Sequence, residues 1–342
     1  MKKHTHIVLI TGSFPPNFCG VGDYTKKVFE ALSLINNYEI KIFHKSEWKL
    51  SYLFKYFNEL IEKKSKIYHM QYPTEGYGYS LLPLFLVLLL KVSGKNTITT
   101  IHELSSRNRS AYIYTQFLIF FSTRSIVSNS LELKHARKFI FNKKKVLLIP
   151  IASNIKKSVF ADVEFDKRTV DLAYFGHFRP IKGIEGFINA VSIVGQNFNV
   201  QLIGQVLHKY SHYFKEIEKK AKELKVNIIA DKDENEVSDL LANVKIIYLP
   251  FPDGISSRRG TLLASIQNGC VVVSTKSNIG EFNDFFEKYI YLVDSDLEAA
   301  AIIKKLLNHE VKPKDTTLLK GMYSWESLVS DHCHLYNSLN KE

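Results

Sequence analysis

Short runs of β-branched and aliphatic residues alternate along the chain with longer segments whose apolar positions recur every three or four residues. The short runs are typical of buried strands, and the longer pattern is typical of helices with one apolar face. In the first half, strands are predicted at His6–Ile10, Ile40–Phe43, Ile67–Gln71, Asn96–Thr100, Ser125–Ser128 and Val146–Ile149, and helices at Tyr24–Leu34, Lys49–Lys63, Leu82–Val92 and Tyr112–Phe121.

The second half follows the same plan. Strands are predicted at Asp171–Phe175, Val200–Ile203, Asn227–Ile229, Lys245–Leu249, Val271–Ser274 and Tyr289–Leu292, and helices at Ile184–Val194, His212–Leu224, Glu236–Asn243, Leu262–Gln267 and Asp296–Asn308. Strands that alternate with helices predict parallel sheets covered on both faces, and therefore two doubly wound α/β domains in series. Residues 156–168 lack periodicity and are predicted to link a domain of residues 1–155 to one of residues 169–323.

Open α/β sheets bind ligands at the carboxyl ends of their strands, so the loops that follow strands are the candidate sites. The stretch Leu249–Thr275 contains a Pro-Asp-Gly turn, then Arg258 and Arg259, and then Gly260 at the start of an apolar helix. Free N–H groups and the positive end of the helix dipole favour an anion there, and the arginines add charge. One interpretation is a phosphate-bearing ligand; the other is a solvated arginine pair.

A second loop in the same half has a similar composition. His177, Arg179 and Lys182 lie between a strand and the helix that follows Gly183. Two cation-rich helix starts in one domain favour a diphosphate as the ligand. Two Asp-x-Asp strings, at residues 231–233 and 294–296, each precede a helical pattern, so N-capping explains them without a metal.

The first half contributes a glycine loop. Gly20 and Gly22 are predicted to allow positive φ and a close approach between the backbone and a ligand at a helix start. The loop resembles a dinucleotide-binding fingerprint only weakly, because Thr25 stands at the third glycine position and two prolines lengthen the turn.

Two histidines of the same half lie in or at the end of a predicted strand. His102, next to Glu103, ends a strand, where it can hydrogen-bond a substrate or serve the fold alone. His69 is a weaker candidate for the same role.

Composition and charge indicate the cellular compartment of the protein and the kind of partner that it binds. The chain has 342 residues, 45% of them hydrophobic, and three cysteines without paired spacing, which favours a reducing compartment. The net charge of +12 is uneven: residues 1–165 carry 24 Lys and Arg against 11 Asp and Glu, and residues 166–342 carry 22 against 23. A basic half implies an anionic partner, and because the sequence has no zinc spacing or RNA-binding aromatic motif, nucleic acid is not expected.

Two apolar stretches lie in the basic half, Leu81–Leu90 and Tyr112–Phe121. Both are shorter than the roughly 20 residues that a membrane-spanning helix needs. They are predicted to be core helices or, alternatively, to place an apolar face rimmed by Lys and Arg on an anionic membrane surface. The apolar run at the start of the sequence is too short for a secretion signal, so a location in the cytoplasm, or peripheral on the inner face of the cell membrane, is expected.

Taken in order, these loops resemble those of the glycosyltransferase family 4 enzymes. The Pro-Pro and Gly-x-Gly loop of that family is similar to SFPPNFCGVGDYT, its strand-end histidine motif to TTIHEL, and its segment before the linker to LLIPIASNI. Its phosphate loop is similar to YFGHFRPIKGIEGFINA, and its last helix, which crosses back to the first domain, to SWESLVSDHCHLY within residues 324–342. The resemblance implies the GT-B fold, in which two Rossmann-like domains face each other across a cleft.

The resemblance also implies an activity and a set of site residues. It implies retaining transfer of a sugar from a nucleoside-diphosphate sugar to a lipid-phosphate-linked or surface-polysaccharide glycan, with no metal or other cofactor. The residues expected to be catalytic are His102, Lys182 and Asp253. Those expected to bind the donor and its phosphates are Gly22, His177, Arg179, Lys182, Ser256, Arg258, Arg259, Gly260 and Thr261. Those expected to bind the acceptor are Gly20, His69 and Glu103.

Some positions depart from the family pattern. His177 stands where the family has arginine, and Ser256 and Ala264 stand where it has two glutamates. Asp253 is the nearest acid and is expected to replace the first glutamate. The departures leave open a GT-B-like binding or partner protein without transferase activity, and the glycine loop leaves open a dinucleotide-dependent oxidoreductase or epimerase.

Overall fold

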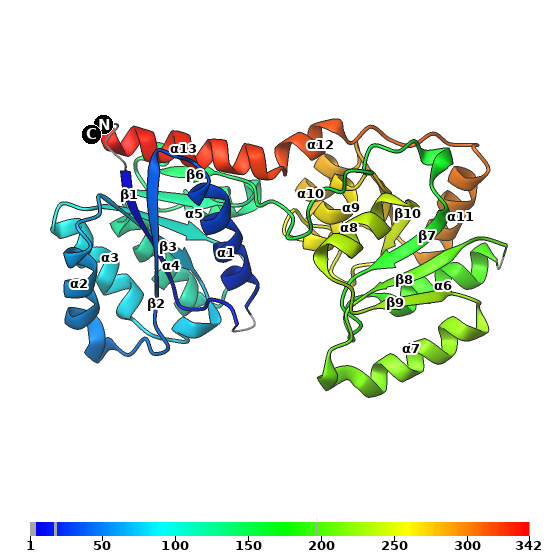
Figure 1. The fold of residues 1–342 in the computed structure, drawn as a ribbon, viewed down its shortest axis with the longest axis horizontal. Helices are drawn as coiled ribbons and strands as arrows, with labels where there is room; N and C mark the ends of the chain where they lie inside the picture. Colours follow the sequence, from blue (N-terminus) through cyan, green and yellow to red (C-terminus); the bar gives the residue numbers. More distant parts are fainter. Residues whose placement is uncertain (1–4, 17–18, 196, 342) are drawn as a thin grey trace. The chain divides into compact units, whose positions relative to one another are not determined.

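The chain folds into two compact units, which a computed structural model describes for residues 5–16, 19–195 and 197–341 (Figure 1). Unit 1 consists of Met1–Ile151 together with Trp325–Glu342, and unit 2 consists of Ala152–Ser324. Each unit has its own six-stranded sheet and its own buried core.

Unit 1 is built on a parallel sheet in the order β2-β1-β3-β4-β5-β6. Its strands are β1 (Thr5–Thr11), β2 (Tyr38–His44), β3 (Ile67–Tyr72), β4 (Asn96–Ile101), β5 (Arg124–Val127) and β6 (Val146–Leu148). Its helices are α1 (Gly20–Ser33), α2 (Leu53–Glu62), α3 (Leu82–Val92), α4 (Arg109–Phe121), α5 (Ser130–Ala136) and α13 (Trp325–Lys341), with single turns η1 (Leu50–Tyr52), η2 (Glu75–Tyr77) and η3 (Lys143–Lys145).

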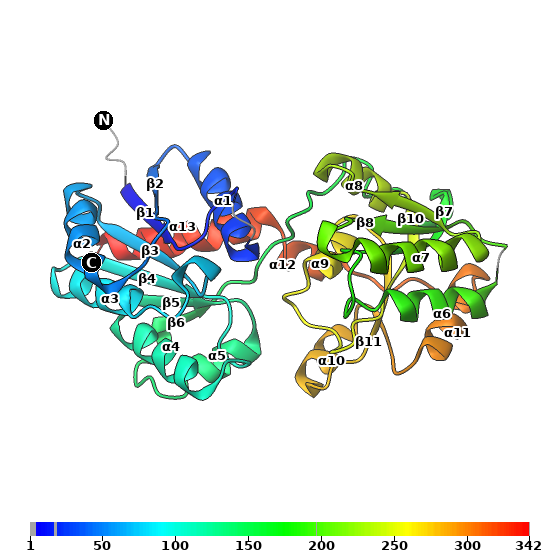
Figure 2. The ribbon, with the colours of Figure 1, turned by 90° about the horizontal axis from the view of Figure 1, so that it is seen from below.

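The two faces of this sheet differ in chemistry. On one face, Tyr68 and Met70 of β3 pack with Leu86 of α3 and Leu118 of α4 in a buried apolar cluster. The other face lies under α1 and α13, which contact each other (Figure 2). Because side chains alternate along a strand, residues 69 and 71 of β3 point to that second face, and both are polar and fully buried.

Unit 2 is built on a parallel sheet in the order β12-β11-β10-β7-β8-β9. Its strands are β7 (Val170–Phe175), β8 (Val200–Gly204), β9 (Asn227–Ala230), β10 (Val244–Leu249), β11 (Val271–Thr275) and β12 (Tyr291–Val293). Its helices are α6 (Ile184–Val194), α7 (Ser211–Glu223), α8 (Glu234–Ala242), α9 (Gly260–Gln267), α10 (Gly280–Phe286), α11 (Asp296–Leu307) and α12 (Thr317–Met322), with single turns η4 (Phe165–Lys167) and η5 (His208–Tyr210).

The strand order of unit 2 defines a switch point. The chain runs from β7 outward through β8 and β9, then returns to β10 on the other side of β7 and continues to β11 and β12. The order of the strands therefore reverses between β7 and β10, and α/β sheets bind ligands at such points. In unit 1 the corresponding pair is β1 and β3.

The predicted doubly wound α/β architecture is confirmed, and each predicted strand forms close to its predicted limits. One prediction about a loop is wrong. α1 begins at Gly20 rather than near Asp23, so Gly20 and Gly22 lie in its first turn, and neither belongs to the described residues with positive φ. Asn17 and Phe18 of the same loop lie outside the described residues.

Residues 156–168, expected to be a linker, belong to unit 2. The fixed point in this segment is Arg168, whose buried guanidinium donates hydrogen bonds to the backbone oxygens of Ala161, Val244 and Asn268 at 2.9, 3.0 and 3.0 Å. Charged donors bonded to carbonyl groups in the interior tie the segment to the sheet.

The two apolar stretches of unit 1 form α3 and the greater part of α4. Among the described residues, no helix has the length and apolar character that crossing a membrane would require.

Candidate functional site

In unit 2 the loops after β7 and β10 meet at the switch point. Gly183, which precedes α6, has φ of +79°, in the left-handed region that favours glycine. A Cβ atom added there would overlap the backbone oxygen of Pro250 in the other loop. The two loops thus touch backbone to backbone, and only glycine fits between them.

The rest of the β7–α6 loop is fixed by its own contacts. Phe178 is fully buried, and its N–H donates to the backbone oxygen of Gln205 at 2.9 Å. The hydroxyl of Tyr174 donates to the backbone oxygen of Lys182 at 3.2 Å. These contacts hold the segment that carries Arg179 and Lys182 at the start of α6.

Cations dominate the electrostatics of this place. Partial burial lowers the pKa of Lys182, and the neighbouring Arg179 and Arg259 lower it further, whereas Asp253 opposes them. Desolvation also lowers the pKa of His177, as do Arg179 and Lys182. The smaller part of each shift comes from neighbouring cations, which shows that positive charges lie close together here and that an anion would be stabilised.

Arg259 is held at the end of the β10–α9 loop. Its guanidinium forms an ion pair with Asp253, donates to the backbone oxygen of Gly254 at 3.3 Å and lies 4.6 Å from the ring centre of Phe251. The Arg259 side chain is 21% exposed and that of Asp253 73%. Asp253, expected to act in catalysis, is therefore engaged by Arg259 and otherwise faces solvent.

Two polar atoms at the site are buried without a hydrogen-bond partner in the described part of the chain: Nε of Arg179 and Nε of Arg259. Buried donors normally find a partner, so each is a position where a ligand oxygen would complete the bonding.

Helix α9 opens next to these arginines. Among the described residues no side chain caps it, and a Cβ added at Gly260 would meet none of their atoms within 4 Å. The amides of its first turn, which include Gly260 and Thr261, are thus available to an anion. Ser256 and Arg258 are half-buried in the turn before the helix. Ala264, at the family's second glutamate position, is fully buried on α9.

The Asp-x-Asp strings are explained by caps. Asp233 accepts from the backbone N–H groups of Asn235 and Glu236 and forms a capping box at the start of α8, as predicted. In the second string the cap is the middle residue, Ser295, whose hydroxyl accepts from the N–H of Glu298. Among the described residues, no group of three or more His, Cys, Asp or Glu side chains is placed to hold a metal ion.

A cavity of about 670 Å³ lies beside this cation-rich place, at the carboxyl ends of β10, β11 and β12. It is lined by Gly183 and Gly186 of the α6 start, by Pro250 to Pro252, and by polar residues of the loops after β11 and β12, including Lys276, Asn278, Asn283 and Asp296.

In unit 1 the loops after β1 and β3 also meet at the switch point. A Cβ at Gly76 would overlap the backbone oxygen of Gly12, and the N–H of Gly76 donates to Oγ of Ser13 at 2.8 Å. Gly22 packs on the same segment, because a Cβ there would lie 3.0 Å from the backbone oxygen of Ser13. A Cβ at Gly20, by contrast, would meet no described atom within 4 Å.

The histidines of unit 1 are joined by a hydrogen-bonded chain. Nε2 of His102 lies 2.9 Å from Oε1 of Gln71, and Nε2 of Gln71 lies 3.2 Å from Nε2 of His69. His69 also lies 2.7 Å from Oγ1 of Thr100 and, through Nδ1, 2.8 Å from the hydroxyl of Tyr336 on α13. Glu103, by contrast, is exposed and accepts a hydrogen bond from Ser106.

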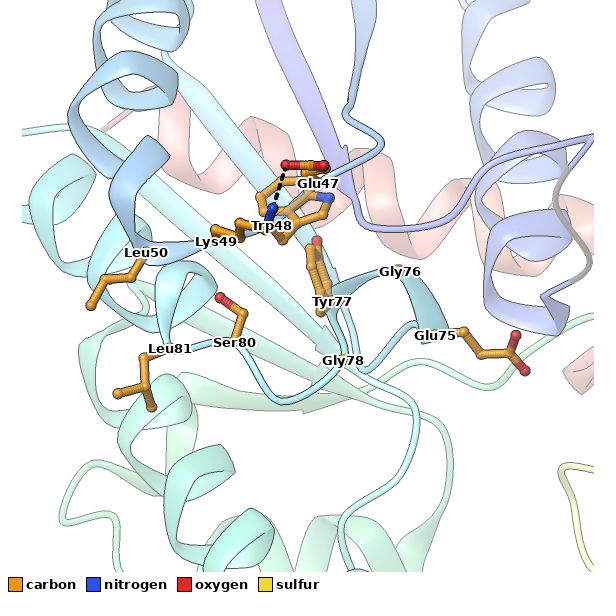
Figure 3. Close-up of a pocket in the computed structure, with 10 residues that line it drawn as sticks. All are labelled: Glu47, Trp48, Lys49, Leu50, Glu75, Gly76, Tyr77, Gly78, Ser80 and Leu81. Carbon is orange, nitrogen blue, oxygen red and sulfur yellow. Dashed lines mark ion pairs between the residues drawn. The ribbon is translucent and has the colours of Figure 1, made fainter.

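A further cavity of unit 1, of about 540 Å³, lies between the loops after β2 and β3 (Figure 3). Trp48 and Tyr77 form its wall, with ring centres 4.7 Å apart and nearly perpendicular planes. Lys49 and Glu47 pair at its rim. The cavity combines apolar and charged groups next to the glycine-rich loop contact of the switch point.

Comparison with known proteins identifies solved structures of similar fold. No family model and no curated protein matches the chain. Solved structures do: HepE from Anabaena, in complex with UDP, is 12% identical, with a TM-score of 0.71 over 98% of this chain and 100% of that chain. A glycosyltransferase from Rickettsia africae is 13% identical, with a TM-score of 0.73 over 100% of both chains. Sucrose-phosphate synthase from Thermosynechococcus elongatus is 15% identical, with a TM-score of 0.66 over 99% of this chain and 100% of that chain.

The chain has the GT-B fold. At these identities the likeness shows the fold alone. The expected fold is thereby confirmed, whereas membership of glycosyltransferase family 4 stays a prediction.

Within this GT-B chain the predicted residues fall into two groups. His177, Arg179, Lys182, Asp253 and Arg259 lie together in unit 2. His69 and His102 belong to one chain of hydrogen bonds in unit 1, which Glu103 does not join.

Two further buried residues contact His102 or the loop that follows it, and neither was predicted from the sequence. Gln71 joins the two histidines. Glu132, fully buried on α5, accepts from the N–H groups of Leu104 and Ser105 at 2.9 Å and from Oγ of Ser105 at 2.7 Å, which anchors the loop after His102. Neither forms a local motif, because the partners of Glu132 are more than 25 residues away along the sequence.

Proposed function

We propose that the protein is a retaining glycosyltransferase that moves a sugar from a nucleoside-diphosphate sugar to a lipid-linked or surface-polysaccharide glycan. The observation that carries this proposal is the cation-rich place at the switch point of unit 2, where two helix starts, Lys182 and two arginines with unpartnered Nε atoms meet. A diphosphate supplies the anion that this arrangement stabilises.

The neighbours in structure support the same donor class. HepE has been solved with UDP, with UDP and glucose, and with UDP-glucose, and the lipopolysaccharide galactosyltransferase WaaB shares the fold at 13% identity. These ligands and activities belong to those proteins, and the proposal extends their class to this chain.

In the proposed reaction the bond between the anomeric carbon and the diphosphate breaks, and negative charge grows on the leaving group. Lys182 and Arg179 at the start of α6, with Arg258, Arg259 and the α9 amides, stabilise that charge. The loop that carries Lys182 and the side chain of Arg259 are already held by their own hydrogen bonds. No metal or other cofactor is part of the proposal.

The acceptor side of the proposal lies in unit 1. His102 hydrogen-bonds the transferred sugar or the acceptor hydroxyl, and the open start of α1 at Gly20 admits the acceptor. His69 supports His102 from the interior rather than by touching the acceptor, since it is fully buried. Glu103 of unit 1 is an exposed acid on the loop that follows His102. Asp253, which the proposal keeps on the donor side in unit 2, is exposed beside Arg259.

The decisive experiment is turnover of a panel of nucleotide sugars by Lys182→Ala. Loss of a preorganised cation from the leaving group should lower kcat by about two orders of magnitude or more. The matched control is Lys304→Ala, an exposed lysine of α11, which should retain the rate. An unaltered rate for Lys182→Ala would refute the assignment of the leaving-group site.

A second candidate function is a GT-B protein that binds a nucleotide or a partner without transferring a sugar. Ser256 and Ala264, in place of the two family glutamates, favour it. Calorimetry with nucleotides and nucleotide sugars separates the candidates: donor binding without turnover supports this one, and turnover excludes it.

We also propose that unit 1 lies against an anionic membrane. Helix α4 carries an outward row of apolar side chains, its membrane face: Ile113, Phe117 and Phe120 are 47, 50 and 52% exposed. Nζ of Lys145 lies 5.8 Å from the ring centre of Phe120, at one end of this row. The loop after α5 adds exposed Phe139 and Phe141 within a run of lysines. Apolar side chains bordered by Lys suit a surface of acidic lipids, where many lipid-linked acceptors reside.

A further inference from the structure

The chain of polar side chains that joins His102 to α13 lies in the interior of unit 1. His69, Gln71 and Tyr336 are fully buried, and Thr100 is 3% exposed. His69, Gln71 and Thr100 lie on the sheet face under α13, where Gln71 of β3 pairs with Thr100 of β4, and Tyr336 lies on α13. His102 follows two residues after Thr100 and is half-buried at the end of the chain of hydrogen bonds.

Close packing of the interior does not require polar side chains at these positions. Apolar groups of similar shape would fill the same space at little or no cost in stability, whereas a buried polar group left without a partner costs free energy. A connected and satisfied polar chain in an interior specifies one arrangement of its members. The member at the open end is His102, the residue placed at the acceptor side.

The hydrogen-bond directions are set by Gln71. Its carbonyl oxygen only accepts, so the facing Nε2 of His102 carries a proton, and its amide nitrogen only donates, so the facing Nε2 of His69 carries none. Neutral His69 then holds its proton on Nδ1, which faces the hydroxyl of Tyr336. When His102 is neutral, a proton on Nε2 means that the lone pair is on Nδ1.

The rings on either side hold the same arrangement. Tyr24 of α1 packs edge-on against His102, with ring centres 5.2 Å apart, and His332 of α13 stacks on His69 at 5.7 Å. Burial, together with His332 and His102, holds the pKa of His69 well below its ordinary value, so His69 stays uncharged at neutral pH.

We propose that Gln71 is a positioning residue that fixes the orientation and the proton location of His102, with His69, Thr100 and Tyr336 holding Gln71 in turn. The inference rests on the proposed function for its effect on turnover, but not for its effect on His102 itself. His102 is the residue that touches substrate, and Gln71 acts through it. The C-terminal helix thereby takes part in the acceptor side of unit 1.

The test that needs no substrate is nitrogen-15 NMR of the histidine rings in the full chain. The signals of His102 are assigned by their loss in His102→Asn. In the wild type, Nε2 of His102 should carry the proton at neutral pH. Gln71→Glu places a carboxylate on that proton and should raise the pKa of His102 by about 1 to 3 pH units. Tyr336→Phe should shift the His69 signals while the thermal transition is retained.

The second test is a double-mutant cycle on turnover. Gln71→Leu should lower kcat by about 10- to 100-fold, the scale of a misplaced catalytic group, with KM for the donor little altered. In a His102→Ala background the same substitution should change kcat less than about twofold, because its effect passes through His102. Gln116→Leu is the matched control: another buried glutamine of unit 1, bonded to the backbone oxygen of His135, it should leave the His102 pKa and turnover unchanged.

Two results would overturn the inference. One is a His102 pKa that is the same in Gln71→Glu and the wild type, since the two side chains would then not be in contact. The other is an equal loss of turnover from Gln71→Leu with and without His102, which would show a merely structural role. If the wild type turns over no nucleotide sugar, the proposed function fails, and the NMR test alone still decides whether Gln71 fixes His102.

Discussion

Two properties of the backbone require glycine at position 183. Its φ of +79° is costly for a residue with a Cβ, and that Cβ would overlap the backbone oxygen of Pro250. The contact joins the loop that carries Lys182 to the loop that carries Arg259. A change at this one position therefore bears on both halves of the cation-rich place.

Gly183→Ala is expected to lower the free energy of unfolding of unit 2 by about 1 to 3 kcal/mol and to weaken nucleotide binding. Hydrogen exchange, resolved for each unit, measures the first effect, and calorimetry measures the second. Gly94→Ala is the control, since Gly94 has a similar φ of +72° and a Cβ there would meet no described atom within 4 Å. If Gly183→Ala costs no more than Gly94→Ala, the overlap with Pro250 has been overestimated.

At the scale of residues, the sequence was enough to predict which charged residues and glycines lie at the site. It was not enough to predict the contacts between residues that are far apart along the chain. Lys182 and Arg179 were predicted from their place between a strand and a helix, which is a local pattern. Gln71 and Glu132 were not, because their partners come from other strands and helices, and no spacing in the sequence encodes these contacts. The ion pair of Asp253 with Arg259 follows from the shape of the turn, which composition does not determine.

Among the elements, α13 stands out because histidines hold it in place. His332 is fully buried, its pKa is lowered to about 4 by burial, and it stacks on His69, whose pKa is also lowered. In the unfolded chain a histidine has a pKa near 6.5. The unfolded state therefore binds more protons below that pH, and stability falls as the pH falls.

The melting temperature is expected to change little above about pH 7 and to decrease as the pH is lowered from about 6.5 toward 4. Each buried neutral histidine contributes a slope of up to about 1.4 kcal/mol per pH unit in that window. Calorimetry between pH 7.5 and pH 5 should show a weaker dependence for His332→Gln than for the wild type. His309→Gln, a change at an exposed histidine, should keep the wild-type slope, and equal slopes in both variants would contradict the assignment.

Elements with strong periodicity were predicted from the sequence, and weak ones were not. The strands have short apolar runs between polar segments, and α3 and α6 were predicted with their observed limits. The short helices α5, α10 and α12, of 7, 7 and 6 residues, give too few turns for a periodic pattern to emerge. The start of α1 was missed because two glycines precede its apolar positions; Gly22 packs on Ser13, whereas a Cβ at Gly20 would meet no described atom within 4 Å.

For the whole molecule, the uneven charge and the membrane face of α4 lead to one expectation. Vesicles that contain acidic phospholipid should bind the protein at low salt and release it at high salt, whereas neutral vesicles should bind it weakly. Removal of both aromatic side chains in Phe117→Ser with Phe120→Ser should weaken binding about 100-fold or more, because each buried phenylalanine contributes about 1.5 to 3 kcal/mol.

Flotation in a density gradient measures this binding. Phe54→Ser is the matched control, since Phe54 is an exposed phenylalanine on α2 of the same unit. Equal flotation of the double variant and the control would show that α4 is not the membrane face.

The overall architecture followed from the sequence because alternation of strands and helices leaves few topologies open. The GT-B fold rested on a resemblance that the solved structures then confirmed. The substrate did not follow, since a sugar and a base are distinguished by a few hydrogen bonds whose geometry no pattern of apolar residues records.

The assignment of α13 to unit 1 has a consequence for how the chain reaches its folded state. Unit 1 receives its last helix only after all of unit 2 has been synthesised. Until then that sheet face is covered by α1 but not by α13, and water can reach the polar groups of His69 and Gln71. Unit 2, which is continuous in sequence, can fold first. When α13 then packs on unit 1, it completes that unit and excludes water from the chain of hydrogen bonds that ends at His102.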